Sequence, residues 1–230
     1  IVDLPGTYSL SSTSEDEEIA RDFILFSAPD VTVIVADATR LERNMNLLLQ
    51  VLQITDRAVL CVNLLDEAKR NKIEINLNAL SRRIGIPVVG ASARSGEGMD
   101  QLLAAIRSVA LGEYVCSPYR KNSLPKHTAQ QVALLEEAVG QYYPEVPNKQ
   151  WIAYRLIEDD PSVTTRFNHP ELLEKAREVH LVIGDNFHDQ WTEAIYADAY
   201  RICSEVVTQA DAGGRLPLDV RLDRILTSRP

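Results

Sequence analysis

Three short apolar runs alternate with amphipathic stretches in the first 112 residues, and this alternation constrains the fold most strongly. The runs cover residues 31–36, 58–62 and 86–90 and are rich in Val, Ile and Leu. The stretches that follow them carry apolar residues at helical spacing: 41–54, 77–84 and 99–111. Continuous apolar runs of this length are typical of parallel strands covered on both faces. We therefore expect each of the three runs, including the one at 31–36, to be such a strand. The alternation predicts an α/β fold with a mostly parallel sheet.

The pattern changes at about residue 115, after which only helical periodicity is present and no strand is predicted. Breaks at proline and glycine divide this part into four expected helices: 127–139, 149–158, 171–179 and 189–210. One of these breaks is the Asp160-Pro161 pair. The sequence therefore predicts an α/β domain over residues 1–114, a small all-helical domain over 115–214 and a linker over 215–230.

Composition limits the possible functions. A formal net charge of −9 argues against a nucleic-acid-binding face, because such faces gather Lys and Arg. Three widely spaced cysteines fit a reducing compartment rather than a disulfide framework. No apolar run approaches the roughly 18–20 residues of a membrane helix. The four histidines lack the spacing of a zinc site, and helix capping explains Asp185, His188 and Asp189 better than a ferrous site does.

The opening stretch contains the first candidate site. Asp3 and Gly6 follow two β-branched residues and are predicted to lie where a buried strand ends in a loop. An Asp there can hold Mg²⁺ through water, and a Gly lets its N–H approach a terminal phosphate. An ordinary strand-to-loop turn remains the alternative. Ser14 and Glu17 then form a capping box that begins a helix, which should end near residues 28–29.

Two further polar loops follow predicted strands. Asp66 can accept two N–H bonds from guanine, Asn63 can tie neighbouring loops or the base edge, and the N–H of Ala93 can reach the guanine carbonyl oxygen. Each pattern alone is weak, and Asn-x-x-Asp is also a common helix-capping pattern. Their order, with spacings of about 60 and 29 residues from Asp3 to Asn63 to Ser92, favours a guanine-nucleotide site. All three loops should lie on one edge of the sheet.

On these motifs the chain resembles the cytosolic part of the ferrous iron transport protein B (FeoB) family. The stretches that carry the resemblance are 3–10 with 14–17 (switch II), 63–66 (guanine-specificity motif), 92–94 (last nucleotide motif), 118–214 (helical domain, likened to a GDP-dissociation inhibitor) and 222–230 (segment before the first membrane helix). The resemblance implies a P-loop GTPase-like sheet, truncated at its N-terminus, with a helical domain after it. It also implies a module at the cytoplasmic face of the bacterial inner membrane.

The family resemblance assigns roles to residues. GTP or GDP would contact Asp3, Leu4, Pro5, Gly6, Asn63, Leu64, Asp66, Ser92, Ala93 and Arg94, and the switch would include Thr7, Tyr8, Ser9 and Ser14. Mg²⁺ would be bound by Asp3 through water, and K⁺ is possible in the intact parent. Thr7 occupies the position where many GTPases carry a water-orienting Gln, so hydrolysis should be slow. Leu64 replaces a common Lys and can cover the base plane.

The chain contains no Gly-x-x-x-x-Gly-Lys-Ser/Thr, which in this family precedes Asp3 by roughly 40–50 residues. We therefore expect a piece of a longer protein that binds GTP poorly, or not at all, when isolated. Its expected partners are guanine nucleotide, its own Fe(II)-permease membrane domain and a possible second copy. Two alternatives remain open: a non-catalytic interaction or oligomerisation fragment, and a soluble GTPase of the ribosome-assembly type.

Overall fold

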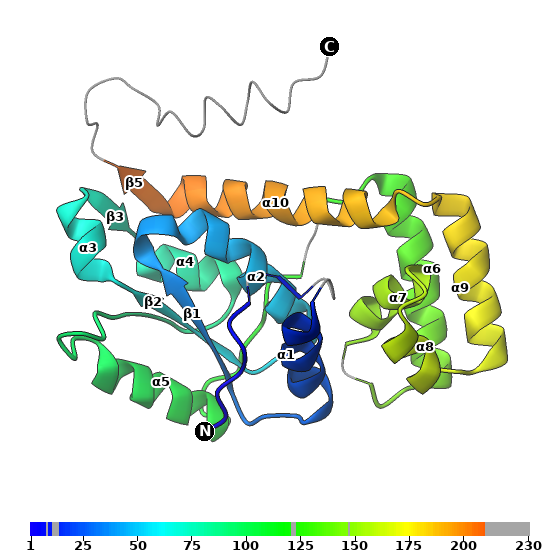
Figure 1. Ribbon diagram of the computed structural model, residues 1–230, viewed down its shortest axis with the longest axis horizontal. Coiled ribbons are helices and arrows are strands. Elements are labelled where there is room, and N and C mark those ends of the chain that lie inside the picture. The colour runs from blue at the N-terminus through cyan, green and yellow to red at the C-terminus, as the bar shows by residue number, and fades with distance from the viewer. Residues whose placement is uncertain (8, 11–13, 121–122, 147, 210–230) are drawn as a thin grey trace, which may run out of the picture.

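The computed structural model describes residues 1–7, 9–10, 14–120, 123–146 and 148–209. It contains an α/β half followed by a helical half (Figure 1). The α/β half comprises α1 (Glu15–Phe26), β1 (Thr32–Asp37), the 3₁₀ helix η1 (Ala38–Arg40), α2 (Leu41–Ile54), β2 (Ala58–Asn63), α3 (Leu65–Arg70), β3 (Ile73–Ile75), α4 (Leu77–Ile84), β4 (Val88–Gly90) and α5 (Met99–Ala110). The helical half comprises α6 (Lys126–Tyr142), α7 (Lys149–Ile157), α8 (Pro161–Arg166), α9 (Pro170–Ile183), α10 (Phe187–Val206) and the short strand β5 (Val207–Gln209).

The main sheet is parallel, as predicted, with strand order β1-β2-β4. β1 pairs with β2 from Thr32 opposite Ala58 to Asp37 opposite Asn63. β4 pairs with the other side of β2 and ends at Gly90 opposite Val62. Because the strands are parallel and in this register, their carboxyl ends lie at one edge of the sheet. The loops after β2 and β4 therefore meet at that edge.

One prediction about β1 is wrong: the strand is covered on one face only. Val33 and Val35 are 39% and 62% exposed. Their partners on β2, Val59 and Cys61, belong to a buried cluster with residues of α5. β1 is an edge strand of the described sheet, and α5 covers that face over β2 but not over β1. An apolar sequence could not show this, because burial depends on which strand occupies the centre.

The opening residues are not the end of a buried strand, contrary to prediction. Residues 1–7 contain no strand, and Ile1 and Val2 are exposed. The chain is held to the core a few residues later, where the N–H of buried Leu10 donates to Oε1 of Gln50 on α2 at 2.6 Å. Helix α1 then begins as predicted, with Ser14 Oγ accepting from the N–H of Glu17. An apolar pair lacking a neighbouring strand has no ladder to join.

The helical half differs from prediction at two places. The predicted break at Asp160-Pro161 is present between α7 and α8, but the short helix α8 that begins there was not predicted; Asp160 caps it and Pro161 occupies its first turn, where the missing N–H costs nothing. The predicted helix over 189–210 ends at Val206 and gives way to β5, which pairs antiparallel with β3. The part after residue 115 is therefore not all-helical. The other predicted helices are present, with ends shifted by a few residues.

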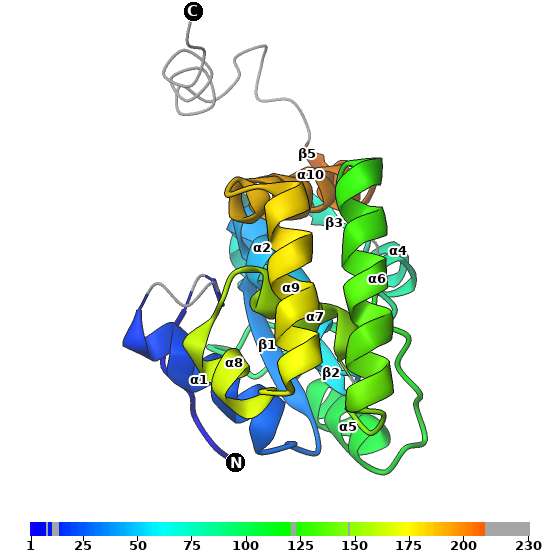
Figure 2. The same ribbon diagram turned by 90° about the vertical axis from the view of Figure 1, so that its right-hand side faces the viewer.

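A continuous hydrophobic core joins the two halves. α10 packs along α2 and α4. α6 and α9 lie side by side in the helical half, nearest the viewer in Figure 2. Arg120 donates to the carbonyl oxygens of Leu52 and Thr55 at the end of α2. The Asn148 side chain donates to the carbonyl of Ile54. Within the described ranges, none of the helices is both long and apolar enough to cross a bilayer.

Candidate functional site

The loops after β2 and β4 are joined by side-chain hydrogen bonds at the carboxyl edge of the sheet. Oδ1 of Asn63 accepts from the N–H of Ala93 at 3.0 Å. Oγ of Ser92 accepts from the N–H of Asp66 at 3.2 Å. A backbone bond from the N–H of Leu65 to the carbonyl of Ala91 runs between the same loops at 3.2 Å. Residues 30 positions apart in sequence thus form one structural unit.

The turn after β2 explains why these groups face the edge. Leu64 adopts a left-handed conformation, with φ 63°, which is uncommon for a residue other than glycine. It occupies the N-cap position of α3 without a side-chain cap. Asn63 binds the neighbouring loop instead of capping the helix, so the helix-capping interpretation of Asn-x-x-Asp does not describe this turn. Of the two roles predicted for Asn63, the structure shows the tie between loops.

Asp66 presents an accessible carboxylate at the edge. It lies in the first turn of α3, where the helix dipole favours negative charge, and its side chain is 47% exposed. Its partner is Arg70, one turn later, at 3.4 Å, and that side chain is itself exposed. Screened pairs of this kind contribute little, so the carboxylate remains available to a ligand. Ala93 and Arg94 are also exposed.

The first loop reaches the same edge through Thr7. Thr7 lines a cavity of about 420 Å³ together with Asn63 and Leu64. The Thr7 hydroxyl donates to the carbonyl of Ser9 and accepts from the N–H of Ser9, which closes a tight local turn. Tyr8, also predicted for the switch, lies outside the described residues. The remaining residues around the cavity are Val35, Ala36, Asp37, Arg40, Arg43, Asn44 and Leu47.

The other predicted site residues of the opening stretch differ in their exposure to solvent. Asp3 and Gly6 are exposed, Leu4 packs against the core, and Pro5 is half-buried. A Cβ added at Gly6 would meet nothing within 4 Å, so no protein atom crowds the Cα of this residue. Among the described residues, no group of three His, Cys, Asp or Glu side chains could hold a metal ion. The exposed Asp3 carboxylate still fits Mg²⁺, which proteins often hold with one or two carboxylates, substrate phosphates and water.

Sequence reasoning missed three residues near the site. Gln50 anchors the opening loop: Oε1 accepts from the N–H of Leu10 at 2.6 Å and from Oγ of Ser9 at 3.2 Å. The sequence offered no local signal for it, because Gln50 lies off the apolar stripe of the 41–54 helix. Arg40 and Arg43 line the cavity that Thr7 and Asn63 share. Two cations directly after a predicted strand could have suggested an anionic ligand.

Comparison with known proteins gives the family. Residues 1–106 match the model of ferrous iron transport protein B, and residues 125–210 match that of the FeoB cytosolic helical domain. The chain belongs to the FeoB family. The Fe(2+) transporter FeoB of Escherichia coli (strain K12) is 36% identical over 167 residues, which are 70% of this chain and 21% of that protein. The Fe(2+) transporter FeoB of Salmonella choleraesuis is 35% identical over 164 residues, with the same coverage.

Solved FeoB structures share the fold. A GDP-bound variant of S. thermophilus NFeoB superposes with a TM-score of 0.77 at 25% identity, covering 90% of this chain and 80% of that one. The cytosolic domain of L. pneumophila FeoB gives a TM-score of 0.74 at 26% identity, covering 90% and 79%. The cytosolic domain of T. maritima FeoB in a GDP form gives 0.76 at 25%, with 90% and 79% covered. The chain spans about a fifth of the full transporters it matches.

Proposed function

We propose that this chain is the guanine-nucleotide-binding regulatory module of a ferrous iron membrane transporter, in which GTP binding and slow hydrolysis gate Fe(II) uptake. The observation that carries the proposal is the bond from the N–H of Ala93 to Asn63, which holds two loops together beside the exposed carboxylate of Asp66. Support also comes from FeoB relatives whose G domains bind GDP. The module's partners are guanine nucleotide and its own membrane domain, on the cytoplasmic side.

The guanine end of the site is the better defined. Asp66 accepts the ring N–H and the exocyclic amine of guanine, a pair that adenine does not present. Leu64, on its left-handed turn, covers the base plane. The N–H of Ala93 serves the guanine carbonyl oxygen while Asn63 keeps its loop in place. Because this N–H already donates to Asn63, the base carbonyl shares it or replaces that bond.

The opening loop, residues 3–7, would contact the phosphate groups of the nucleotide. Gly6 is exposed, and its N–H would contact a terminal phosphate; Asp3, also exposed, would hold Mg²⁺ through water, and the ion would supply positive charge to the phosphate oxygens. Arg40 and Arg43 add positive charge to the cavity shared with Thr7. Since a Thr replaces the water-orienting Gln of many GTPases, hydrolysis is slow. Activation by K⁺ in the intact parent stays a prediction.

These 230 residues hold no Gly-x-x-x-x-Gly-Lys-Ser/Thr cradle for the β-phosphate. We therefore expect weak nucleotide binding by the chain on its own and negligible turnover. The free edge of β1, with Val33 and Val35 uncovered, offers a place where a further strand could pair. GTP turnover by the isolated chain would contradict this expectation.

The test exchanges Asp66→Asn in the full transporter. We expect the preference to move from guanine towards xanthine nucleotides, because the amide no longer offers two acceptors to the base. Binding of GDP, XDP and ADP is measured by fluorescence titration. Glu67→Gln is the matched control, since Glu67 is the next acid on α3 and also pairs with Arg70. Unchanged guanine affinity in Asp66→Asn would overturn the site assignment.

A second candidate is a non-catalytic interaction module. Thr7 at the position of the water-orienting Gln, and the lack of a Gly-x-x-x-x-Gly-Lys-Ser/Thr motif in these 230 residues, favour it. Failure of the full transporter to bind GDP at all, with wild-type residues at the edge, would support this alternative. Membership of the FeoB family gives no support to the ribosome-assembly type of GTPase.

A further inference from the structure

Helix α1 directly follows the switch region and has a small buried face. It buries only Ala20, Arg21 and Ile24, and one of these three side chains is charged. The chain before it is fixed at Leu10 by Gln50 and again at Ser14, which caps α1. A displacement of the chain at Ser14 must therefore either move α1 or be resisted by whatever holds α1 in place.

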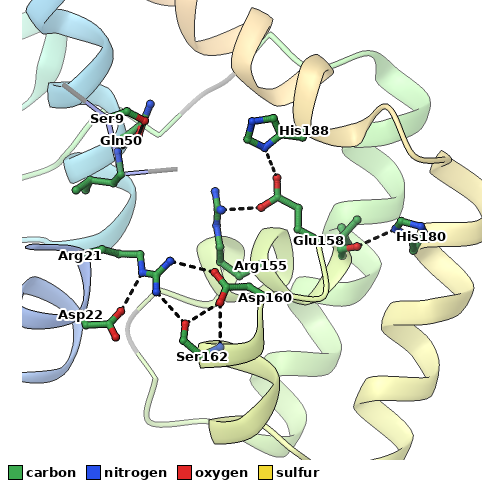
Figure 3. A network of polar contacts seen from close by, with 12 residues as sticks. Ser9, Arg21, Asp22, Gln50, Arg155, Glu158, Asp160, Ser162, His180 and His188 are labelled. Carbon is green, nitrogen blue, oxygen red and sulfur yellow. Dashed lines mark hydrogen bonds and ion pairs between the residues drawn. The ribbon is translucent and has the colours of Figure 1, made fainter. Parts of the chain in front are cut away.

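Arg21 holds α1 against the helical half (Figure 3). Its side chain is 1% exposed, and all three guanidinium nitrogens have partners. Nη1 donates to Oδ2 of Asp160 at 3.0 Å and Nη2 to Oγ of Ser162 at 2.9 Å, across 139 and 141 residues of sequence. Nε donates to Oδ1 of Asp22 at 2.9 Å. A buried guanidinium needs such partners, because an unpaired buried charge is strongly unfavourable.

The carboxylate of Asp160 serves both sides of this contact. Oδ2 accepts from Arg21, while Oδ1 accepts from the N–H and the Oγ of Ser162 at 3.0 and 2.7 Å and so caps α8. Burial alone would raise the pKa of Asp160, but bonds from Ser162 and the charge of Arg21 lower it below its ordinary value. The start of α8 and the docking of α1 thus depend on the same ionised group.

The contact continues into the rest of the helical half. Glu158, two residues before Asp160, binds Nη1 of Arg155 at 2.6 Å and Nδ1 of His188 at 2.8 Å (Figure 3). Arg155 belongs to α7 and His188 to α10, so the turn between α7 and α8 is tied to both. A second contact, Arg166 of α8 over the ring of Phe26, joins α8 to the end of α1.

We propose that Arg21 is a positioning residue that makes the docking of α1 and the α7–α8 turn one cooperative unit. A change at the switch region then reaches the helical half through α1. That the change arises from guanine nucleotide rests on the proposed function, whereas the coupling itself needs no ligand. The physical basis is a buried charge on α1 whose partners Asp160 and Ser162 lie on the α7–α8 turn, since neither element can move alone without separating the guanidinium from them.

Amide hydrogen exchange in the 230-residue chain, without nucleotide, tests the coupling. In Arg21→Met we expect amides of α1 and of α8 both to exchange about tenfold faster or more, because both lose a shared partner. In Asp160→Asn both should also exchange faster, and the double variant should change little beyond the larger single effect. Arg177→Met, an exposed arginine on α9, is the matched control and should leave both helices unchanged.

Faster exchange confined to α1 would overturn the proposal, because Arg21 would then stabilise its own helix only. Additive effects in the double variant would overturn it as well. If Arg21→Met does not fold, Arg21→Lys keeps the charge but loses the planar fork, and an acceleration in both helices smaller than that of Asp160→Asn is expected. Absence of GDP binding would reject the proposed function while leaving this exchange result intact.

Discussion

Two polar clusters of this molecule use similar chemistry in opposite surroundings. The edge cluster (Asn63, Asp66, Ser92 and Ala93) joins two loops at the end of the sheet, and its carboxylate is 47% exposed. The corner cluster (Arg21, Asp22, Asp160 and Ser162) joins the two halves, with Arg21 1% and Asp160 10% exposed. Buried charges are committed to the fold because losing a partner is costly, whereas exposed groups can exchange partners with a ligand. The comparison separates the corner cluster, whose buried charges stabilise the fold, from the edge cluster, whose exposed carboxylate can exchange its partner for a ligand.

The largest expected effect is at the corner cluster. Asp160→Ala should lower the free energy of unfolding by about 3–5 kcal/mol, because it takes one of two carboxylate partners from the buried guanidinium of Arg21 and also removes the N-cap of α8. Urea unfolding followed by circular dichroism measures the change. The control Asp185→Ala removes a fully exposed acid and should cost less than about 0.5 kcal/mol. Equal losses of unfolding free energy in Asp160→Ala and Asp185→Ala would contradict the view that the buried carboxylate is committed to the fold.

The stability that the corner cluster contributes should depend on pH. The folded-state pKa of Asp160 is lowered, with bonds from Ser162 and the charge of Arg21 outweighing the effect of burial. A group with a lowered folded pKa stabilises the fold above its unfolded pKa, and that contribution is lost as the pH falls through the folded value. The difference in unfolding free energy between wild type and Asp160→Asn should therefore shrink on acidification. A difference constant from neutral to acidic pH would contradict the ionised pair.

At the edge cluster, Asn63→Ala should cost about 1 kcal/mol of stability, the typical net contribution of one hydrogen bond. The loss of guanine-nucleotide affinity in the full transporter should be larger, because the Ala93 loop loses its tie to the base site. Thermal unfolding and GDP titration give the two numbers. Asn71→Ala, at the end of α3, is a suitable amide control.

Arg155 sharpens the comparison, because it is buried like Arg21 but poorly paired. Its Nε and Nη2 have no hydrogen-bond partner among the described residues, and burial lowers its pKa despite the charge of Glu158. Its guanidinium also lies near the rings of Trp151 and Trp191. Replacing the whole pair, as Arg155→Met together with Glu158→Gln, should change the free energy of unfolding by less than about 1 kcal/mol, since exchanging a complete buried ion pair for uncharged residues of similar size is often neutral. A loss of unfolding free energy as large as that of Asp160→Ala would show that burial of the charge, and not the quality of its pairing, sets its contribution to stability.

The smallest effect on stability is expected for Asp66→Asn. Surface changes usually stay within about 0.5 kcal/mol, and the pair with Arg70 is solvent-exposed. The same variant should strongly alter nucleotide preference. Chemical denaturation of the chain, set beside nucleotide titration of the full transporter, checks this separation of stability from binding.

Local signals in the sequence placed several elements correctly. The capping box at Ser14 begins α1, the apolar stripe gives α2 its observed ends, and Gly85 closes α4 in a left-handed conformation. These features depend on neighbours within about one helical turn, which the sequence displays directly. The order and spacing of the loops after β2 and β4 were also visible, and the structure places those loops at one edge.

Other features depended on contacts between distant residues. β1 and β2 both have apolar sequences, yet Val35 is exposed and Cys61 is buried, because in the part of the chain that the structure describes α5 covers this face of the sheet over β2 and not over β1. β5 follows a helical pattern without a break, and its pairing with β3 overrides local preference. Neither outcome has a local signal.

The sequence by itself determined the α/β class, most helix starts and the residue types available at the carboxyl edge of the sheet. The tertiary structure decided which strand is central, which charges are buried and which of them meet. Arg21 illustrates the reason: its partners lie 139 and 141 residues away, and no local pattern announces them. Short-range preferences can be recognised from neighbouring residues in the sequence, whereas the pairing of a buried charge forms only when the two halves pack together.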